Sequence, residues 1–212
     1  MLERQLAATF DLLRDKGASS ILDVGGGHGQ LACELAGRGH RVSVLASSAA
    51  AVSDSLRPAI RSGAVRLLIG NLGEPPVEPR SFDVVLSYRL LAHAYDLRGL
   101  IAGLARAAER TVIVDYATFR SFNAVADLLF AAKKRVEKNT RPFRVIREAE
   151  IDHLFRESGC RRAGRRPQFF WPMALHRFMK SPALSRALEV PVAALGLKAL
   201  FGSPVIARFD RA

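Results

Sequence analysis

The sequence is poor in cysteine and contains no long apolar run. Its 212 residues include two cysteines, Cys33 and Cys160, which lie far apart and match no metal-ligand spacing. This pattern predicts no disulfide framework and no metal site, and it is typical of the reducing cytoplasm. No window reaches the ~20 uninterrupted apolar residues of a membrane span. The charged, amphipathic first residues do not resemble a signal peptide. We therefore expect a cytoplasmic protein.

Positive charge, by contrast, is in excess. The formal net charge is +12, and 49% of the residues are hydrophobic. Such a basic protein favours anionic partners, namely nucleic acid, an anionic lipid surface or an acidic substrate. A genome rich in arginine codons produces the same excess without any such partner. The hydrophobic fraction is sufficient for a full core, and the length is that of one domain, 1–212.

Short apolar runs alternate with helical segments along the chain. Most of the runs are apolar on both faces, which is typical of parallel strands covered by helices on each side. The sequence therefore predicts an α/β fold, a doubly wound, seven-stranded, mostly parallel sheet. Strands are expected at 20–24, 41–46, 65–70, 82–87, 111–116, 165–173 and 203–211. Helices are expected at 4–16, 29–39, 49–63, 97–109, 121–138, 147–160 and, broken by prolines, 174–201.

The first expected strand runs into a glycine-rich loop, "ILDVGGGHGQ" (21–30). In a doubly wound sheet, ligands bind beyond the carboxyl ends of the strands, where this loop lies. Residues 27–32 satisfy G-x-G-x-x-A, a weak dinucleotide signature. The wider stretch from Asp23 to Gly29 reads D-x-G-x-G-x-G. A carboxylate at Asp23 would repel a phosphate, so it favours a ligand with an ammonium group and no phosphates.

This stretch resembles motif I of the class I S-adenosylmethionine (SAM) dependent methyltransferases, of the small-molecule or lipid type. The resemblance implies a methyltransferase whose product is S-adenosylhomocysteine (SAH). In the family, the acidic residue helps to hold the methionyl ammonium, and the glycines let the backbone approach SAM. Two further stretches match the family, 70–96 and 110–118. The implied cofactor residues are Asp23, Gly25, Gly26, Gly27, Gly29, Ala46, Ser47, Asn71, Leu72 and Ser87.

One position departs from the family pattern. The second strand usually ends in Asp or Glu, whose carboxylate takes both ribose hydroxyls, whereas this strand ends in Ala46, followed by Ser47 and Ser48. A hydroxyl replaces part of that contact, at a cost of ~1–2 kcal/mol. The departure leaves two alternatives open. One is an NADP-dependent oxidoreductase that uses the two serines and Arg57, and the other is a binding or scaffold protein without catalysis.

The methyl acceptor is expected to be a small aromatic, quinone-like or lipidic molecule, reached by in-line SN2 transfer. His93 is the candidate general base, and Tyr88 is a second catalytic candidate. We expect the cofactor core, with an N-terminal helix, in 1–117, lid and substrate elements in 118–202 and the last strand in 203–212. The candidate substrate residues are Tyr116, Phe119, Trp171 and His176.

Two other partners follow from the charge pattern. The apolar stretch 172–201 carries interspersed Arg and Lys side chains, which would suit peripheral contact with an anionic membrane. A buried helical pair between the last two strands is the favoured explanation of this pattern. An RNA methyltransferase is the remaining alternative. The sequence lacks the Asn/Asp-Pro-Pro-aromatic stretch typical of nucleobase amino-methylation, so nucleic acid is the less favoured acceptor.

Overall fold

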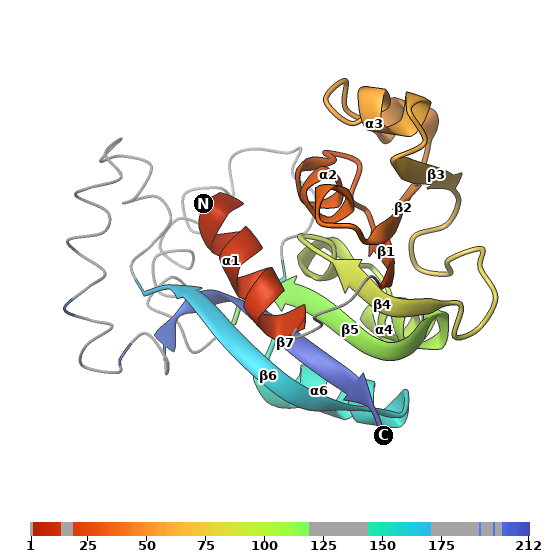
Figure 1. Cartoon of the computed structure of the whole chain (residues 1–212). Coiled ribbons are helices and arrows are strands. Elements are labelled where there is room, and N and C mark those ends of the chain that lie inside the picture. The colour runs from red at the N-terminus through yellow and green to blue at the C-terminus, as the bar shows by residue number, and fades with distance from the viewer. Residues whose placement is uncertain (1, 14–18, 119–143, 171–190, 192–196, 198–200) are drawn as a thin grey trace, which may run out of the picture.

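Seven strands form one sheet in the computed structural model (Figure 1), which describes residues 2–13, 19–118, 144–170, 191, 197 and 201–212. The strand order is β3-β2-β1-β4-β5-β7-β6. The strands from β3 to β5 run parallel to their neighbours, and β7 is antiparallel to both β5 and β6. The predicted fold class is confirmed. The strands are β1 (Ser20–Val24), β2 (Arg41–Ala46), β3 (Val65–Ile69), β4 (Phe82–Ser87), β5 (Ala108–Tyr116), β6 (Cys160–Phe169) and β7 (Ser203–Arg211).

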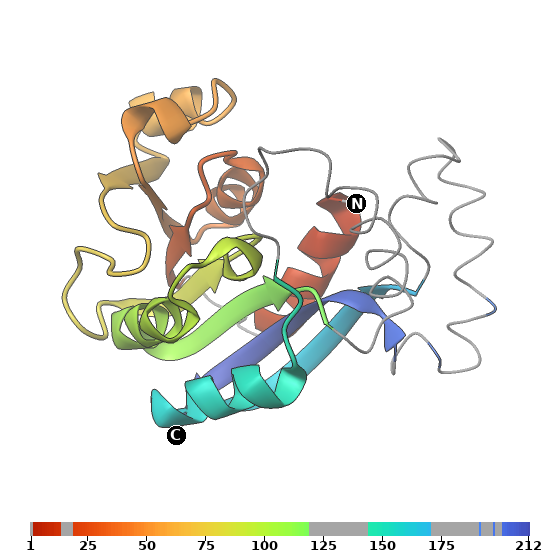
Figure 2. The same cartoon turned by 180° about the vertical axis from the view of Figure 1, so that it is seen from behind.

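Helices cover both faces of the sheet. The helix α1 lies in front of the sheet in Figure 1, and α4 and α6 lie in front of it in the reverse view of Figure 2. The helices are α1 (Leu2–Leu13), α2 (Gln30–Gly37), α3 (Arg57–Arg61), α4 (Leu97–Ala107) and α6 (Glu148–Glu157), with 3-10 turns η1 (Ala49–Ala51) and η2 (Leu91–His93). The helices expected at 121–138 and within 174–201 lie outside the described residues.

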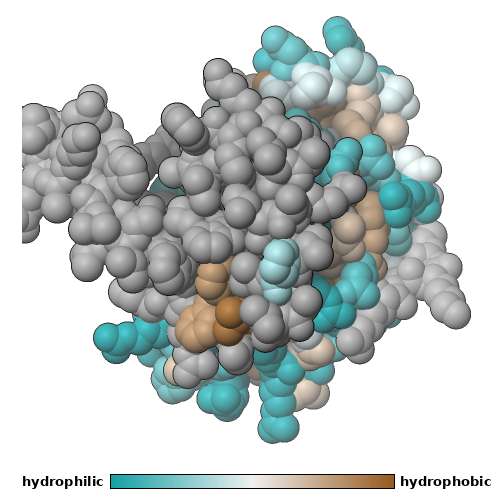
Figure 3. Space-filling model, turned by 90° about the vertical axis from the view of Figure 1, so that its left-hand side faces the viewer, coloured by the Kyte–Doolittle hydropathy of each residue, from teal (hydrophilic) through white to brown (hydrophobic). Residues whose placement is uncertain are grey.

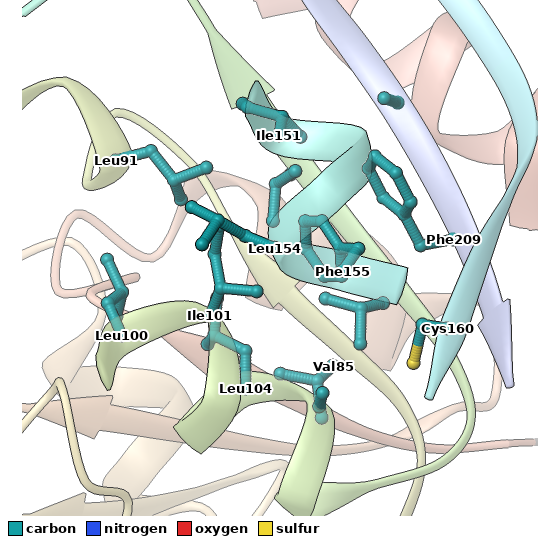
Figure 4. Close-up of a cluster of buried hydrophobic side chains, with 14 of the residues drawn as sticks. Val85, Leu91, Leu100, Ile101, Leu104, Ile151, Leu154, Phe155, Cys160 and Phe209 are labelled. Atoms are coloured by element: carbon teal, nitrogen blue, oxygen red, sulfur yellow. The ribbon is translucent and has the colours of Figure 1, made fainter. Parts of the chain in front are cut away.

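Each face of the sheet has its own apolar core, because alternate side chains of a buried strand point to opposite faces. On β1, Ile21 belongs to the core under α1 and α2, and Leu22 belongs to the core under α4 and α6. Figure 4 shows the second core, in which side chains of α4 and α6 meet those of β4 and β7. There the Phe155 and Phe209 rings stack with centroids 3.8 Å apart.

The structure corrects two element boundaries. The strand expected at 165–173 is β6, which begins at Cys160 and pairs with β7 along its length. Its run of arginines lacks the apolar alternation of a strand. The structure accommodates their charges by pairing them with acids of the neighbouring helix α6, Arg162 with Asp152 at 2.7 Å and Arg165 with Glu148 at 2.7 Å.

The helix expected at 49–63 is also wrong as a single element. The segment consists of η1 and the short α3, separated by a turn. Proline is tolerated only in the first turn of a helix, and Pro58 stands at the start of α3. The residues before it turn toward the glycine loop, as described below.

The segment expected to form a lid, 118–202, contributes directly to this framework. α6 packs on α4 and β6, and β6 forms an edge of the sheet. A lid or substrate role for 119–143 and 171–190 stays a prediction, since both ranges lie outside the described residues.

Few large apolar side chains are exposed on the described part of the chain. On the face in Figure 3, small hydrophobic groups are bordered by hydrophilic side chains. The exposed large apolar side chains are those of Ile69, Tyr95 and Phe201. Among the described helices, none combines the length and apolarity needed to cross a bilayer. The stretch that suggested peripheral membrane contact, 172–201, is described only at positions 191, 197 and 201.

Candidate functional site

The strand order reverses between β1 and β4. From β1 the chain continues to β2 and β3 on one side, and from β4 it continues to β5 on the other. Ligands of open α/β sheets bind beyond the carboxyl ends of the strands at such a switch point. The loop Gly25–Gly29 follows β1 there, and residues 88–93 follow β4. The topology therefore brings the glycine loop, Tyr88 and His93 to one edge of the sheet.

Close packing explains three of the four predicted glycines in the loop. A Cβ at Gly26 would lie 2.0 Å from the Asp23 carboxylate, one at Gly27 would lie 2.3 Å from the carbonyl oxygen of Ala51, and one at Gly29 would lie 2.6 Å from the Leu56 side chain. At Gly25, which has a φ of +82°, a Cβ would meet only Leu90 and Leu72, at 3.7 and 3.9 Å. Gly25 is thus the position whose backbone a ligand can approach most closely.

The segment after β2 holds this loop in place. The Ser53 amide donates to the carbonyl of Gly27 at 2.8 Å, and the hydroxyls of Ser53 and Ser55 donate to the carbonyl of His28 at 3.0 and 3.1 Å. Neither serine was predicted to have this role. The four serines and the aspartate at 47–55 could have indicated a turn, because these residue types favour caps and turns over helix interiors.

Asp23 is a buried carboxylate at the end of β1. Its residue is 3% exposed, and desolvation raises the pKa of the carboxyl group to about 7 while the charge of Arg89 opposes the rise. Within the described residues, its oxygens have no hydrogen-bond donor. A buried acid without a partner is costly when ionised. The side chain therefore suits a cationic ligand group that would supply the missing charge.

Arg89 and Asp115 extend this polar cluster. Arg89 has a left-handed backbone, with φ +58°, and its amide donates to Asp115 Oδ1 at 2.5 Å. Burial raises the pKa of Asp115 to about 6. The glycine loop, Asp23, Tyr88 and Arg89 line one small cavity, together with Gln5 of α1. Asp23 and Tyr88 are site candidates from the sequence, whereas the position of Asp115 beside them was not predicted.

Comparison with known proteins agrees with this geometry. Residues 22–113 match a family model described as a methyltransferase domain, and this range runs from β1 into β5. This match identifies a methyltransferase domain over that range, which spans less than half of the chain. A methyltransferase domain agrees with SAM as the cofactor that the sequence predicts. No curated protein matches the chain in a sequence search.

Two solved structures show the same fold over nearly the whole chain. Magnesium protoporphyrin IX methyltransferase from Synechocystis PCC 6803, with bound SAH, has a TM-score of 0.69 at 16% identity and covers 100% of this chain and 82% of its own. Geranyl diphosphate methyltransferase, in complex with GPP and sinefungin, has a TM-score of 0.70 at 17% identity and covers 99% and 79%. At these identities the likeness establishes the fold.

The remaining residues predicted to bind SAM differ in their burial and in their hydrogen bonds. Ser87, at the end of β4, is fully buried, and its hydroxyl has no hydrogen-bond partner among the described residues. Asn71 is exposed, and its Oδ1 accepts from the Gly73 amide at 3.0 Å. Leu72 lies against the open side of Gly25. An orphaned hydroxyl, an unpartnered acid and an open glycine backbone together fit the donor and acceptor groups of SAM.

The ribose position lacks a carboxylate, as the sequence indicated. Ala46 is 2% exposed at the end of β2, and Ser47 and Ser48 follow it with exposed side chains. Arg57, which the NADP alternative required, is paired with Asp54 at 3.0 Å. The methyltransferase match therefore replaces the oxidoreductase interpretation.

The candidate catalytic and substrate residues lie in different surroundings. Tyr88 is buried, and its hydroxyl shares a 2.7 Å hydrogen bond with that of Thr9 on α1. Burial raises the pKa of its phenol, which opposes a role as a base. His93 ends η2 and is half-buried beyond β4. The Tyr116 hydroxyl, on the other face of the sheet, accepts from Arg162 at 2.8 Å. Phe119, Trp171 and His176 lie outside the described residues.

Proposed function

We propose that this methyltransferase transfers the methyl group of SAM to a small aromatic, quinone-like or lipid-like acceptor. The observation that carries the proposal is the cavity at the switch point, where the unpartnered Asp23 carboxylate and the open backbone of Gly25 lie together. The two solved enzymes of the same fold are named for small molecules with large apolar parts, magnesium protoporphyrin IX and geranyl diphosphate. An acceptor of that class agrees with the aromatic residues that the sequence concentrates after residue 117.

The protein's part in the reaction is mainly alignment. SAM supplies an already activated methyl group on a sulfonium. The chain must hold the acceptor in line with that group and exclude water. A hydroxyl or carbon acid also requires a base. We propose His93 for that role, because η2 follows β4 at the carboxyl edge of the sheet, where the glycine loop also lies. Tyr88 then has a structural role through Thr9.

The acceptor class is tested with radiolabelled SAM and three pools: an apolar small-molecule extract, total RNA and total protein from the source cells. We expect label in the small-molecule pool. Label confined to RNA or protein would contradict the proposal.

The role of His93 is tested separately on the acceptor so identified. His93→Ala should lower kcat about 10²- to 10³-fold for a hydroxyl or carbon acceptor, as expected for a lost general base. His153→Ala is the matched control, since His153 lies on α6 and pairs with Glu157. Equal kcat values for the His93 and His153 variants would show that His93 is not the base.

A further inference from the structure

Two opposite charges line the cavity beside the glycine loop. Asp23 contributes a carboxylate from the end of β1, and Arg89 contributes a guanidinium from the turn after β4. The amino-acid end of SAM carries the complementary pair, an ammonium and a carboxylate. We infer that Arg89 binds the carboxylate of SAM. With the ammonium held at Asp23, as the family resemblance implies, the cavity would then hold both charges of the zwitterion. This inference rests on SAM being the cofactor.

The Arg89 side chain is available for a ligand. Its guanidinium makes no ion pair or hydrogen bond with any residue that the structure describes, and the residue is exposed at the cavity. The electrostatic influence of Arg89 nevertheless reaches both Asp23 and Asp115. Guanidinium groups suit carboxylate ligands because their N–H groups form a planar fork that matches the two oxygens.

The backbone of Arg89 is held in a strained conformation. A left-handed backbone is unfavourable for residues with a Cβ, and it persists where the surrounding structure imposes it. The Asp115 carboxylate accepts a 2.5 Å hydrogen bond from the Arg89 amide, which connects the turn after β4 to the end of β5. Asp115 is thus a positioning residue, which fixes the direction in which the Arg89 side chain leaves the chain.

The lack of a carboxylate at Ala46 makes the pair of charges at Asp23 and Arg89 more important for binding SAM. In the absence of a carboxylate at Ala46, the adenosine half of SAM lacks its strongest family contact. The amino-acid half must then provide more of the discrimination between SAM and other nucleosides. A two-charge site supplies it, because a ligand that lacks either charge leaves a charged group at the cavity without its partner.

The test measures binding by calorimetry with two probes. One is SAH, and the other is its decarboxylated analogue, 5′-deoxy-5′-(3-aminopropylthio)adenosine, which keeps the ammonium and lacks the carboxylate. We expect the wild-type protein to bind SAH about 10- to 100-fold more tightly than the analogue, the range of a charge-assisted hydrogen-bond pair. Arg89→Met should weaken SAH by the same factor and change the analogue by less than about threefold. The affinity ratio then approaches one.

Two further variants keep the result interpretable. Arg89→Gly accepts the left-handed backbone without strain, so it removes the guanidinium while favouring the fold, and it should also collapse the ratio. Arg80→Met is the matched control, because Arg80 is likewise left-handed, with φ +56°, but precedes β4 at the opposite edge of the sheet. It should leave the ratio unchanged.

Three outcomes would overturn the inference. Equal binding of the two probes by the wild-type protein would show that the carboxylate is not recognised. An unchanged ratio in Arg89→Met and Arg89→Gly would show that another group recognises it, and an accompanying rise in the KM of the acceptor would assign Arg89 to acceptor binding. Failure of wild-type protein to bind SAH at millimolar concentration would remove the cofactor assignment as well.

Discussion

The two ends of the cofactor site are built differently. At the end of β2, where the ribose is expected, stand a buried alanine and exposed serines, Ala46, Ser47 and Ser48. Where β1, β4 and β5 end, the chain gathers three charged side chains, those of Asp23, Arg89 and Asp115. The charged end has the buried acid Asp23 and the half-buried acid Asp115, and the ribose end has no acid among these residues. We therefore expect the amino-acid half of SAM to provide most of the binding free energy.

The largest effect should come from removing the Asp23 charge. Asp23→Asn keeps the shape of the side chain but loses its charge, so we expect SAH to bind about 30- to 100-fold more weakly, as for a charge-assisted hydrogen bond. Calorimetry at pH 8 measures this loss. An affinity within threefold of wild type would show that Asp23 does not hold the ammonium.

The same variant should stabilise the free protein. The pKa of Asp23 rises from 3.8 to about 7 on folding, so the native state binds the proton more tightly than the unfolded state. The free energy of unfolding therefore falls as pH rises from about 4 to about 7, and the loss persists above pH 7. Asp23→Asn avoids this cost, and we expect about 1–3 kcal/mol more stability at pH 8. Binding and stability should thus change in opposite directions.

The pH dependence of binding is the next largest effect. Ionised Asp23 is the form that holds the ammonium, so SAH affinity should fall about tenfold per pH unit below 7 and level off above it. The other groups at the cavity are Arg89, the neutral Tyr88, exposed His28 and, behind Arg89, Asp115, whose own pKa of about 6 adds to the fall only at lower pH. Asp23→Asn should flatten the slope between pH 6 and 8. A slope that survives this substitution would assign the titration to another group.

Tyr88→Phe should have a modest and purely structural effect. The substitution removes the 2.7 Å hydrogen bond to Thr9, which joins α1 to the end of β4. We expect a loss of about 0.5–1.5 kcal/mol of stability and a kcat within threefold of wild type. Denaturant unfolding and steady-state kinetics measure the two quantities, with Thr9→Val as the matched variant. A hundredfold fall in kcat would return Tyr88 to the catalytic candidates.

The smallest effect is expected at the ribose end. Ser47 has an exposed side chain after β2, so Ser47→Ala should change SAH affinity by less than about threefold, the loss of one neutral hydrogen bond at most. A tenfold loss of SAH affinity, measured by calorimetry, would show that the serine hydroxyl replaces the missing carboxylate. The ribose end would then contribute to binding as the charged end does.

Much of this architecture could be predicted from local sequence patterns. The bounds of β1, β2 and β4 match the expected ranges, because these strands are apolar and end at clear loop signals. β6 was placed five residues late, since its arginines pair with acids distant in the sequence. The hydrogen bond between Arg89 and Asp115 also depends on tertiary structure, because residues 26 positions apart meet only when β4 and β5 align.

The glycine loop, too, was predictable in its position but not in its tertiary contacts. Its motif predicted where a ligand binds. It did not predict that Gly27 is required by the carbonyl of Ala51, or that Ser53 and Ser55 fasten the loop. Those contacts come from the turn after β2, which the sequence pattern wrongly predicted as part of a helix.

The most direct test of the account compares SAH with 5′-methylthioadenosine, which has the same adenosine but lacks the amino-acid group. If the charged end dominates, calorimetry at pH 8 should show that methylthioadenosine binds at least about 100-fold more weakly than SAH, since two charge-assisted contacts are lost. Binding of the two ligands within about fivefold of each other would place the affinity in the adenosine half and contradict the account.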